Sequence, residues 1–114
     1  SKPIEHLRLQ PPDCRPHPKA LEAIRQADLI CIGPGSVFTS VIPNLLVPEI
    51  TEAILASPAP KVYICNVMTQ PGESDGMSAS EHATTITRIV GRNVIDYVLV
   101  NVTPPSFELL QRYE

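Results

Sequence analysis

The sequence predicts an α/β domain built on a mostly parallel sheet, and three observations carry this prediction. Apolar, β-branched segments of strand length alternate with segments whose apolar residues recur at helical spacing. The segments that join successive strands are long enough for the crossovers that parallel strands require. The chain has 114 residues and 13 prolines, which stand between these segments rather than in repeats, so one domain of many short elements is expected.

In the first half of the chain, the pattern predicts two strands and two or three helices. Residues 4–9 are predicted as a short strand, and a proline-rich loop follows them up to Pro18. Residues 19–27 carry apolar residues at helical spacing directly after this proline, where proline favours a helix start. Residues 29–32 are a continuous apolar run, typical of a strand buried on both faces of a parallel sheet. Residues 37–57 are expected to form one broken helix or two short helices, because prolines interrupt and end this stretch.

In the second half, two more strands are predicted. Residues 61–67 are the next strand, and a long polar loop with two turn dipeptides follows at 68–76. Residues 96–102 are the last strand. A final helix is expected from Pro105 onward, because proline suits the first turn of a helix.

The helix predicted between these strands has clear start and stop signals. Ser78 is followed three residues later by Glu81, which together form a capping box, and apolar residues then recur at helical spacing up to Val90. Gly91 ends the helix in the usual way.

Composition and charge exclude several function classes. The formal net charge is −3, the nine Lys and Arg are dispersed, and there is no Trp, so a nucleic-acid partner is not expected. No apolar stretch approaches the ~20 residues of a membrane span. Three well-separated cysteines support neither a disulfide framework nor a metal site and are expected to be reduced, mostly buried thiols. The chain is therefore expected to be soluble and cytoplasmic.

The first candidate site is the loop after the strand at 29–32. Ligands of an open parallel sheet bind beyond the carboxyl ends of its strands. The loop residues Gly33, Pro34 and Gly35 let the backbone approach an anion closely, while Ser36 and Thr39 supply hydroxyl donors. The loop is thus a candidate phosphate site. The alternative is a tight strand-to-helix turn with an ordinary serine cap.

The second candidate site follows the strand at 61–67. Asn66 ends that strand, and Thr69 and Gln70 lie in the loop behind it. Amides pair well with base or sugar edges, and the carboxylates of Glu73 and Asp75 could hold ribose hydroxyls or Mg²⁺. The alternative is a solvated surface loop.

The remaining polar residues give weaker indications of a functional site. His82 is a lone histidine in the first turn of its helix and is expected to be a surface or capping residue. Asn101, at the end of the last strand, and Tyr113 beyond it form a third candidate, with simple packing as its alternative. No serine-hydrolase motif and no metal-ligand spacing occurs in the sequence.

Three segments are distinctive when taken together. They read ADLICIGPGSVFTS at 27–40, IPNLLVP at 42–48 and VYICNVMTQPGE at 62–73. In these segments the chain resembles the YvcK/CofD family of bacterial gluconeogenesis factors. The resemblance continues through 75–76 and 80–82 to 112–113.

This resemblance implies a Rossmann-like, three-layer α/β/α fold, of which residues 1–114 are a single, incomplete CofD-like domain fragment. It also implies a cytoplasmic protein that binds UDP-activated sugars such as UDP-N-acetylglucosamine, without a cofactor, a metal or a catalytic residue. Such proteins support growth on gluconeogenic carbon, cell shape and cell-wall synthesis. By motif position, the residues implied to line the ligand cleft are Gly33, Gly35, Ser36, Thr39, Asn66, Thr69 and Gln70, with Tyr113 near the ligand.

Two other interpretations stay open. The sister branch, 2-phospho-L-lactate transferase, is similar in fold but moves a phosphate-linked group onto a deazaflavin precursor with Mg²⁺. Its loop reads closer to Gly-Pro-Ser-Asn-Pro, whereas Gly35-Ser36-Val37 follows the regulator branch. Met77 stands where many regulators carry Tyr, which leaves a ring contact from that position in question. The third interpretation is an interaction module, in which an acidic surface and an open sheet edge favour a homo-oligomer.

Overall fold

Helices and strands alternate along the chain as the sequence predicts. The computed structural model describes residues 6–69, 75–102 and 106–109. The α/β class is confirmed. The elements in chain order are α1 (Pro18–Gln26), β1 (Ile30–Ile32), the π-helical turn η1 (Val37–Val41), α2 (Ile42–Leu45), α3 (Pro48–Ala56), β2 (Lys61–Thr69), α4 (Asp75–Val90), β3 (Tyr97–Val102) and β4 (Ser106–Leu109).

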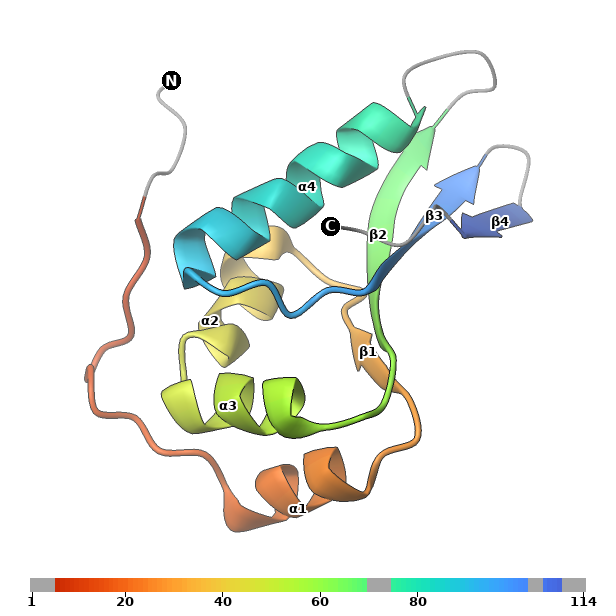
Figure 1. Cartoon of the computed structure of the whole chain (residues 1–114). Coiled ribbons are helices and arrows are strands. Elements are labelled where there is room, and N and C mark those ends of the chain that lie inside the picture. The colour runs from red at the N-terminus through yellow and green to blue at the C-terminus, as the bar shows by residue number, and fades with distance from the viewer. Residues whose placement is uncertain (1–5, 70–74, 103–105, 110–114) are drawn as a thin grey trace.

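The four strands form one sheet in the order β1-β2-β3-β4. The first three are parallel, with Ile32 opposite Tyr63 and Tyr63 opposite Val98, so the prediction of a mostly parallel sheet is confirmed. The helices of both crossovers lie on the same side of this sheet (Figure 1). That arrangement is expected when successive strands are added in one direction by right-handed crossovers. The described residues therefore supply the sheet and one helical layer of the expected three-layer fold.

The C-terminal segment differs from its prediction. The sequence predicts a helix from Pro105, but β4 is a strand that pairs antiparallel with β3, with Leu109 opposite Leu99. Without β4, that edge of β3 would present a row of unpaired backbone N–H and C=O groups. Nucleating a helix is costly for a short segment, whereas pairing with an existing strand satisfies its backbone groups at once. The sheet edge therefore overrides the local helix signal.

The predicted N-terminal strand is also wrong over the part that the structure describes. Residues 6–9 belong to no strand. In Figure 1 this red segment runs on the far side of the helices from the sheet. A strand needs a neighbouring edge with which to exchange hydrogen bonds, and within the described residues this segment pairs with none of the strands β1–β4.

Helix α4 starts earlier than predicted and stops where predicted. It begins at Asp75, three residues before Ser78, so the expected Asp75-Gly76 turn is its first turn. The positive end of the helix dipole favours an acidic residue at this place. At the other end Gly91 has φ +84°, and its N–H donates to the Thr87 carbonyl at 2.8 Å. This is the left-handed ending that glycine allows.

The core lies between the sheet and its helical layer. Alternate residues of β1, β2 and β3 are buried beneath α2 and α4, whereas the other set is less buried although it is also apolar. The expectation that the strand at 29–32 is buried on both faces is therefore wrong within the described residues, because Cys31 of β1 is exposed. The expectation of mostly buried thiols is also wrong, since only Cys65 of the three cysteines is buried. The sheet residues of the core are Ile30, Ile32, Tyr63, Cys65, Val98 and Val100.

Within residues 6–69, 75–102 and 106–109, no single helix combines the length and apolar character of a membrane span. One bent pair, Val37–Leu45 with Pro48–Ala56, passes that test by length and composition, with a bend of 75°. Several of its residues, including Ile42 and Ile54, belong to the hydrophobic core. The apolar character of this pair is therefore explained by packing beneath the sheet.

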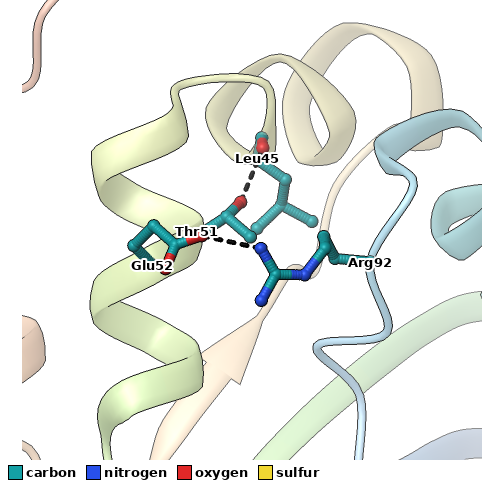
Figure 2. Close-up of polar contacts among 4 residues, drawn as sticks. All are labelled: Leu45, Thr51, Glu52 and Arg92. Carbon is teal, nitrogen blue, oxygen red and sulfur yellow. Dashed lines mark hydrogen bonds and ion pairs between the residues drawn. The ribbon is translucent and has the colours of Figure 1, made fainter.

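Two polar contacts hold α3 in place (Figure 2). The buried Thr51 hydroxyl donates to the Leu45 carbonyl at 2.7 Å, which ties α3 to the end of α2. On the outer surface, Arg92 and Glu52 form an exposed ion pair at 2.7 Å. The first contact satisfies a buried backbone acceptor, whereas the second remains solvated, so their contributions to stability should differ.

The Thr51→Val variant tests this difference. Valine has the shape of threonine but leaves the Leu45 carbonyl without its donor, so we expect the free energy of unfolding to fall by about 1–2 kcal/mol. Urea unfolding followed by circular dichroism measures it. The Arg92→Ala variant should change stability by less than about 1 kcal/mol, since exposed pairs contribute little. Equal losses in the two variants would contradict the assignment.

Candidate functional site

A cavity of about 650 Å³ lies between the loop after β1, strand β2 and helix α4. This position is beyond the carboxyl end of β1, where parallel sheets bind ligands. The loop and η1 form one wall, the buried Tyr63 of β2 lies at the inner side, and α4 forms the opposite wall with three polar residues. The lining residues are Gly35, Ser36, Val37, Phe38, Tyr63, Glu81, His82 and Thr85.

The loop wall is closely packed against its surroundings. Gly33 has φ +87°, and a Cβ there would lie 3.1 Å from the Ile64 carbonyl oxygen of β2. A Cβ on Gly35 would lie 2.9 Å from the Cβ of Ser40. Both positions therefore require glycine, one for its backbone conformation and one for space. The two glycines bring the loop backbone to the edge of the cavity.

Ser36 does not act as an ordinary helix cap. It occupies the N-cap position of η1 but makes no side-chain cap hydrogen bond. The turn is closed instead by its carbonyl, which accepts from the N–H groups of Ser40 and Val41, both at 2.9 Å. Ser36 is exposed and lines the cavity, so its hydroxyl is placed where a ligand could use it.

Strand β2 and helix α4 meet through a thiol–imidazole contact. The Sγ of Cys65 lies 3.8 Å from Nδ1 of His82, and Cys65 is 1% exposed. Burial raises the pKa of the nearby Tyr63 hydroxyl above its ordinary value, and the charge and hydrogen bond of Cys65 raise it further. Tyr63, Cys65 and His82 thus form a connected polar group at the inner side of the cavity.

Alkaline titration tests the environment of Tyr63. Since the folded protein holds the phenol proton more tightly than the unfolded chain does, the unfolded chain ionises first, above about pH 10. We expect the stability difference between the wild type and Tyr63→Phe to be constant below about pH 9. Above about pH 10 the wild type should lose up to about 1.4 kcal/mol per pH unit relative to the variant. Denaturant unfolding of both proteins at several pH values measures this, and parallel curves would contradict it.

The structure separates the residues predicted for the first candidate site. Gly35 and Ser36 line the cavity described above. Gly33 and Pro34 line a second cavity, of about 420 Å³, together with apolar residues of β1 and α3. Thr39 is exposed on η1 and lines neither of these two cavities. The loop therefore lies between the two cavities, and only its second half, Gly35 and Ser36, lines the cavity of about 650 Å³.

The second candidate site lies partly outside the described residues. Asn66 and Thr69 belong to β2, while Gln70 and Tyr113 lie outside the residues that the structure describes. The register between β2 and β3 shifts between Cys65 and Met68, so a bulge or irregularity interrupts the strand pairing across Asn66 and Val67. Bulges are over-represented beside functional sites because they redirect side chains. The bulge thus coincides with the segment that the sequence singled out.

The polar wall on α4 was missed by the sequence analysis. His82 was expected at the surface or as a cap, yet it is half-buried beside Cys65 and lines the cavity with Glu81 and Thr85. Glu81 and Thr85 are one turn apart, so they share one face of the helix. The sequence signal that could have indicated this wall is the polar face of a helix that directly follows a strand.

Mg²⁺, which the transferase branch implies, has one candidate ligand here. Within the described residues no group of three or more His, Cys, Asp and Glu side chains could hold a metal ion. Among the described lining residues of the cavity, Glu81 carries the carboxylate. Mg²⁺ is commonly held by one or two carboxylates together with substrate phosphates. Glu81 is therefore the residue that would hold such an ion.

The whole chain matches a single family model. The model describes 2-phospho-L-lactate transferase CofD and matches residues 1–114. The chain belongs to the CofD family. Its parallel sheet and strand-end loop are consistent with that membership.

Among CofD-family relatives, the chain is similar to proteins called gluconeogenesis factor. It is 53% identical over 112 residues to one from Halalkalibacterium halodurans, covering 98% of this chain and 35% of that protein. It is 47% identical over 111 residues to one from Bacillus subtilis, covering 97% and 35%. The chain thus spans about a third of the length of these relatives.

The chain is also similar in fold to a solved structure. The crystal structure of protein BH3568 from Bacillus halodurans superposes with a TM-score of 0.74 at 55% sequence identity. The match covers 90% of this chain and 33% of that protein.

Proposed function

We propose that this chain is part of a cytoplasmic regulatory protein that binds a nucleotide sugar of the UDP-N-acetylglucosamine type. Its role would be linked to gluconeogenic growth, cell shape and cell-wall synthesis. The observation that carries the proposal is the cavity of about 650 Å³ bounded by the Gly35-Ser36 loop and the polar face of α4. Its volume is in the range of small-molecule sites.

The chemistry of the lining suits a ligand with both charged and uncharged parts. The Gly35-Ser36 backbone and the Ser36 hydroxyl offer donors to phosphate oxygens. Phe38, which is half-buried, offers aromatic area to a base or sugar ring. Glu81 and Thr85 offer an acceptor and a hydroxyl to sugar hydroxyls. Relatives named gluconeogenesis factor support the link to gluconeogenic growth.

Calorimetric titration of the full-length protein with UDP-N-acetylglucosamine, with GDP as the comparison, tests this proposal. We expect binding of the UDP-sugar only. Ser36→Ala should weaken that binding by about 5- to 10-fold, because one hydroxyl donor to the ligand is lost. Arg92→Ala, in an exposed pair away from the cavity, is the control and should bind as the wild type does. Binding of GDP in preference to the UDP-sugar would refute the proposal.

A transferase is the second candidate, and the description of the matching family model favours it. In this candidate the cavity would hold a phosphate-linked donor, and Glu81 would hold Mg²⁺, whose charge would offset that of the phosphates. Measurable transfer to a deazaflavin precursor by the full-length protein would establish this activity. Glu81→Gln should then lose it, whereas the regulator proposal expects no transfer by either protein.

A further inference from the structure

We propose that His82 donates a hydrogen bond from Nε2 to an anionic group of the ligand, and that Cys65 is the positioning residue that holds its ring in the required tautomer. This inference rests on the proposed nucleotide-sugar site and names the residue that would recognise the negative charge of that ligand. Neither side chain was identified as a site residue from the sequence.

The charges of the lining residues indicate His82 as the group that binds an anion. The described lining residues of the cavity include no lysine or arginine, and their one acidic group is Glu81. A phosphate group in this cavity needs strong donors that offset its charge. His82 is the one described lining residue whose side chain can carry a positive charge, and it can donate a hydrogen bond in its neutral form as well.

The contact with Cys65 determines which ring nitrogen serves the cavity. Nδ1 of His82 faces the buried Sγ at 3.8 Å. A neutral imidazole has one N–H and one acceptor nitrogen, and the partner of the first nitrogen decides which is which. If the Cys65 thiol donates to Nδ1, the proton of a neutral ring sits on Nε2. Nε2 is then the donor that remains for the ligand.

Burial supports this direction of donation. Cys65 and Tyr63, two residues apart on β2, are each 1% exposed. A buried thiol is best satisfied by an acceptor within the protein, and Nδ1 of His82 is such an acceptor at 3.8 Å. Thr85, one turn further along α4, adds a neutral donor on the same wall.

Matched histidine variants separate this role from simple packing. Glutamine places an amide donor near the position of Nε2, whereas asparagine places one near Nδ1. In the full-length protein we expect His82→Gln to keep affinity for UDP-N-acetylglucosamine within about 3-fold of wild type. His82→Asn should lose about 10- to 100-fold. The same loss should occur with UDP and be absent with uridine, because uridine lacks the anionic group.

The cysteine variants test positioning by a spectroscopic signature. Nitrogen chemical shifts of ¹⁵N-labelled histidine report which ring nitrogen carries the proton. We expect the Nε2–H form in the wild type and in Cys65→Ser, which keeps a hydroxyl donor, and a mixture of forms in Cys65→Ala. Affinity should follow the same order. Circular dichroism of each variant checks that the fold is retained.

The outcomes distinguish the two proposals. If the wild type binds the UDP-sugar and His82→Asn binds it equally well, or if the ring carries its proton on Nδ1, the inference is wrong while the proposed function stands. If the wild type prefers GDP, the proposed function fails, and the same variants titrated with GDP decide the role of His82. A wild type that binds neither nucleotide overturns both.

Discussion

Replacing Ile86 by alanine is expected to lower the free energy of unfolding by about 3–4 kcal/mol. Ile86 is fully buried, at 0% exposure, and belongs to the core between α4 and the sheet. The substitution removes three carbons from a closely packed interior, so it loses their transfer free energy and leaves a cavity as well. Because α4 also carries the polar wall of the candidate site, loss of this anchor should weaken ligand binding too.

Ile89 provides the matched control on the same helix. It packs against the core but is only partly buried, so Ile89→Ala should cost clearly less than Ile86→Ala. Urea unfolding of the three proteins, followed by circular dichroism, gives the free energies. Similar losses at the two positions would mean that α4 does not present Ile86 to the core as described.

The Gly33→Ala variant should have the next largest effect, a loss of about 2–4 kcal/mol. Its φ of +87° costs an L-residue about 1–2 kcal/mol. The added methyl group would also lie 3.1 Å from the Ile64 carbonyl oxygen, a backbone atom of β2 that is held by the sheet. The loop must therefore move, and with it the Gly35-Ser36 wall of the cavity.

The Gly91→Ala variant serves as a control that separates the conformational cost of Gly33→Ala from its steric cost. Gly91 has a similar φ of +84°, but a Cβ there would meet nothing within 4 Å. Gly91→Ala should therefore lose only the conformational part, about 1–2 kcal/mol, and should not change nucleotide binding. Denaturant unfolding and calorimetry on both variants measure stability and affinity. Equal losses of stability at the two glycines would show that crowding against Ile64 contributes nothing.

Part of this protein could be predicted from the sequence because the relevant signals are local. Helix α1 (Pro18–Gln26) lies one residue earlier than the predicted 19–27, and Gly91 ends α4 as predicted. The continuous apolar runs became parallel strands, and their spacing required crossovers of helical length. The Gly33–Ser36 loop was identified as a candidate site because the carboxyl end of a parallel strand is where such loops gather.

Other features depend on neighbours that are distant in the sequence. Ser106–Leu109 has a local helix signal, but the open edge of β3 makes it a strand. The apolar run at β1 indicates burial on both faces, yet Cys31 is exposed because the described helices cover only one face. The conformation of the first segment and the burial of the second therefore depend on the part of the protein against which each one packs.

The candidate site also combines features that local sequence reveals with features that depend on distant neighbours. The glycines and Ser36 of the loop were visible as a motif, since backbone approach and hydroxyl donors have a residue signature. The role of His82 was not visible, because its environment consists of Cys65, 17 positions away along the chain, and a cavity wall from another strand-end loop. The sequence alone determined the parallel α/β framework and the loop that opens onto its edge. Only the packing of α4 against β2 decided which polar side chains face that loop, because a helix can present any of its faces until the core beneath it is formed.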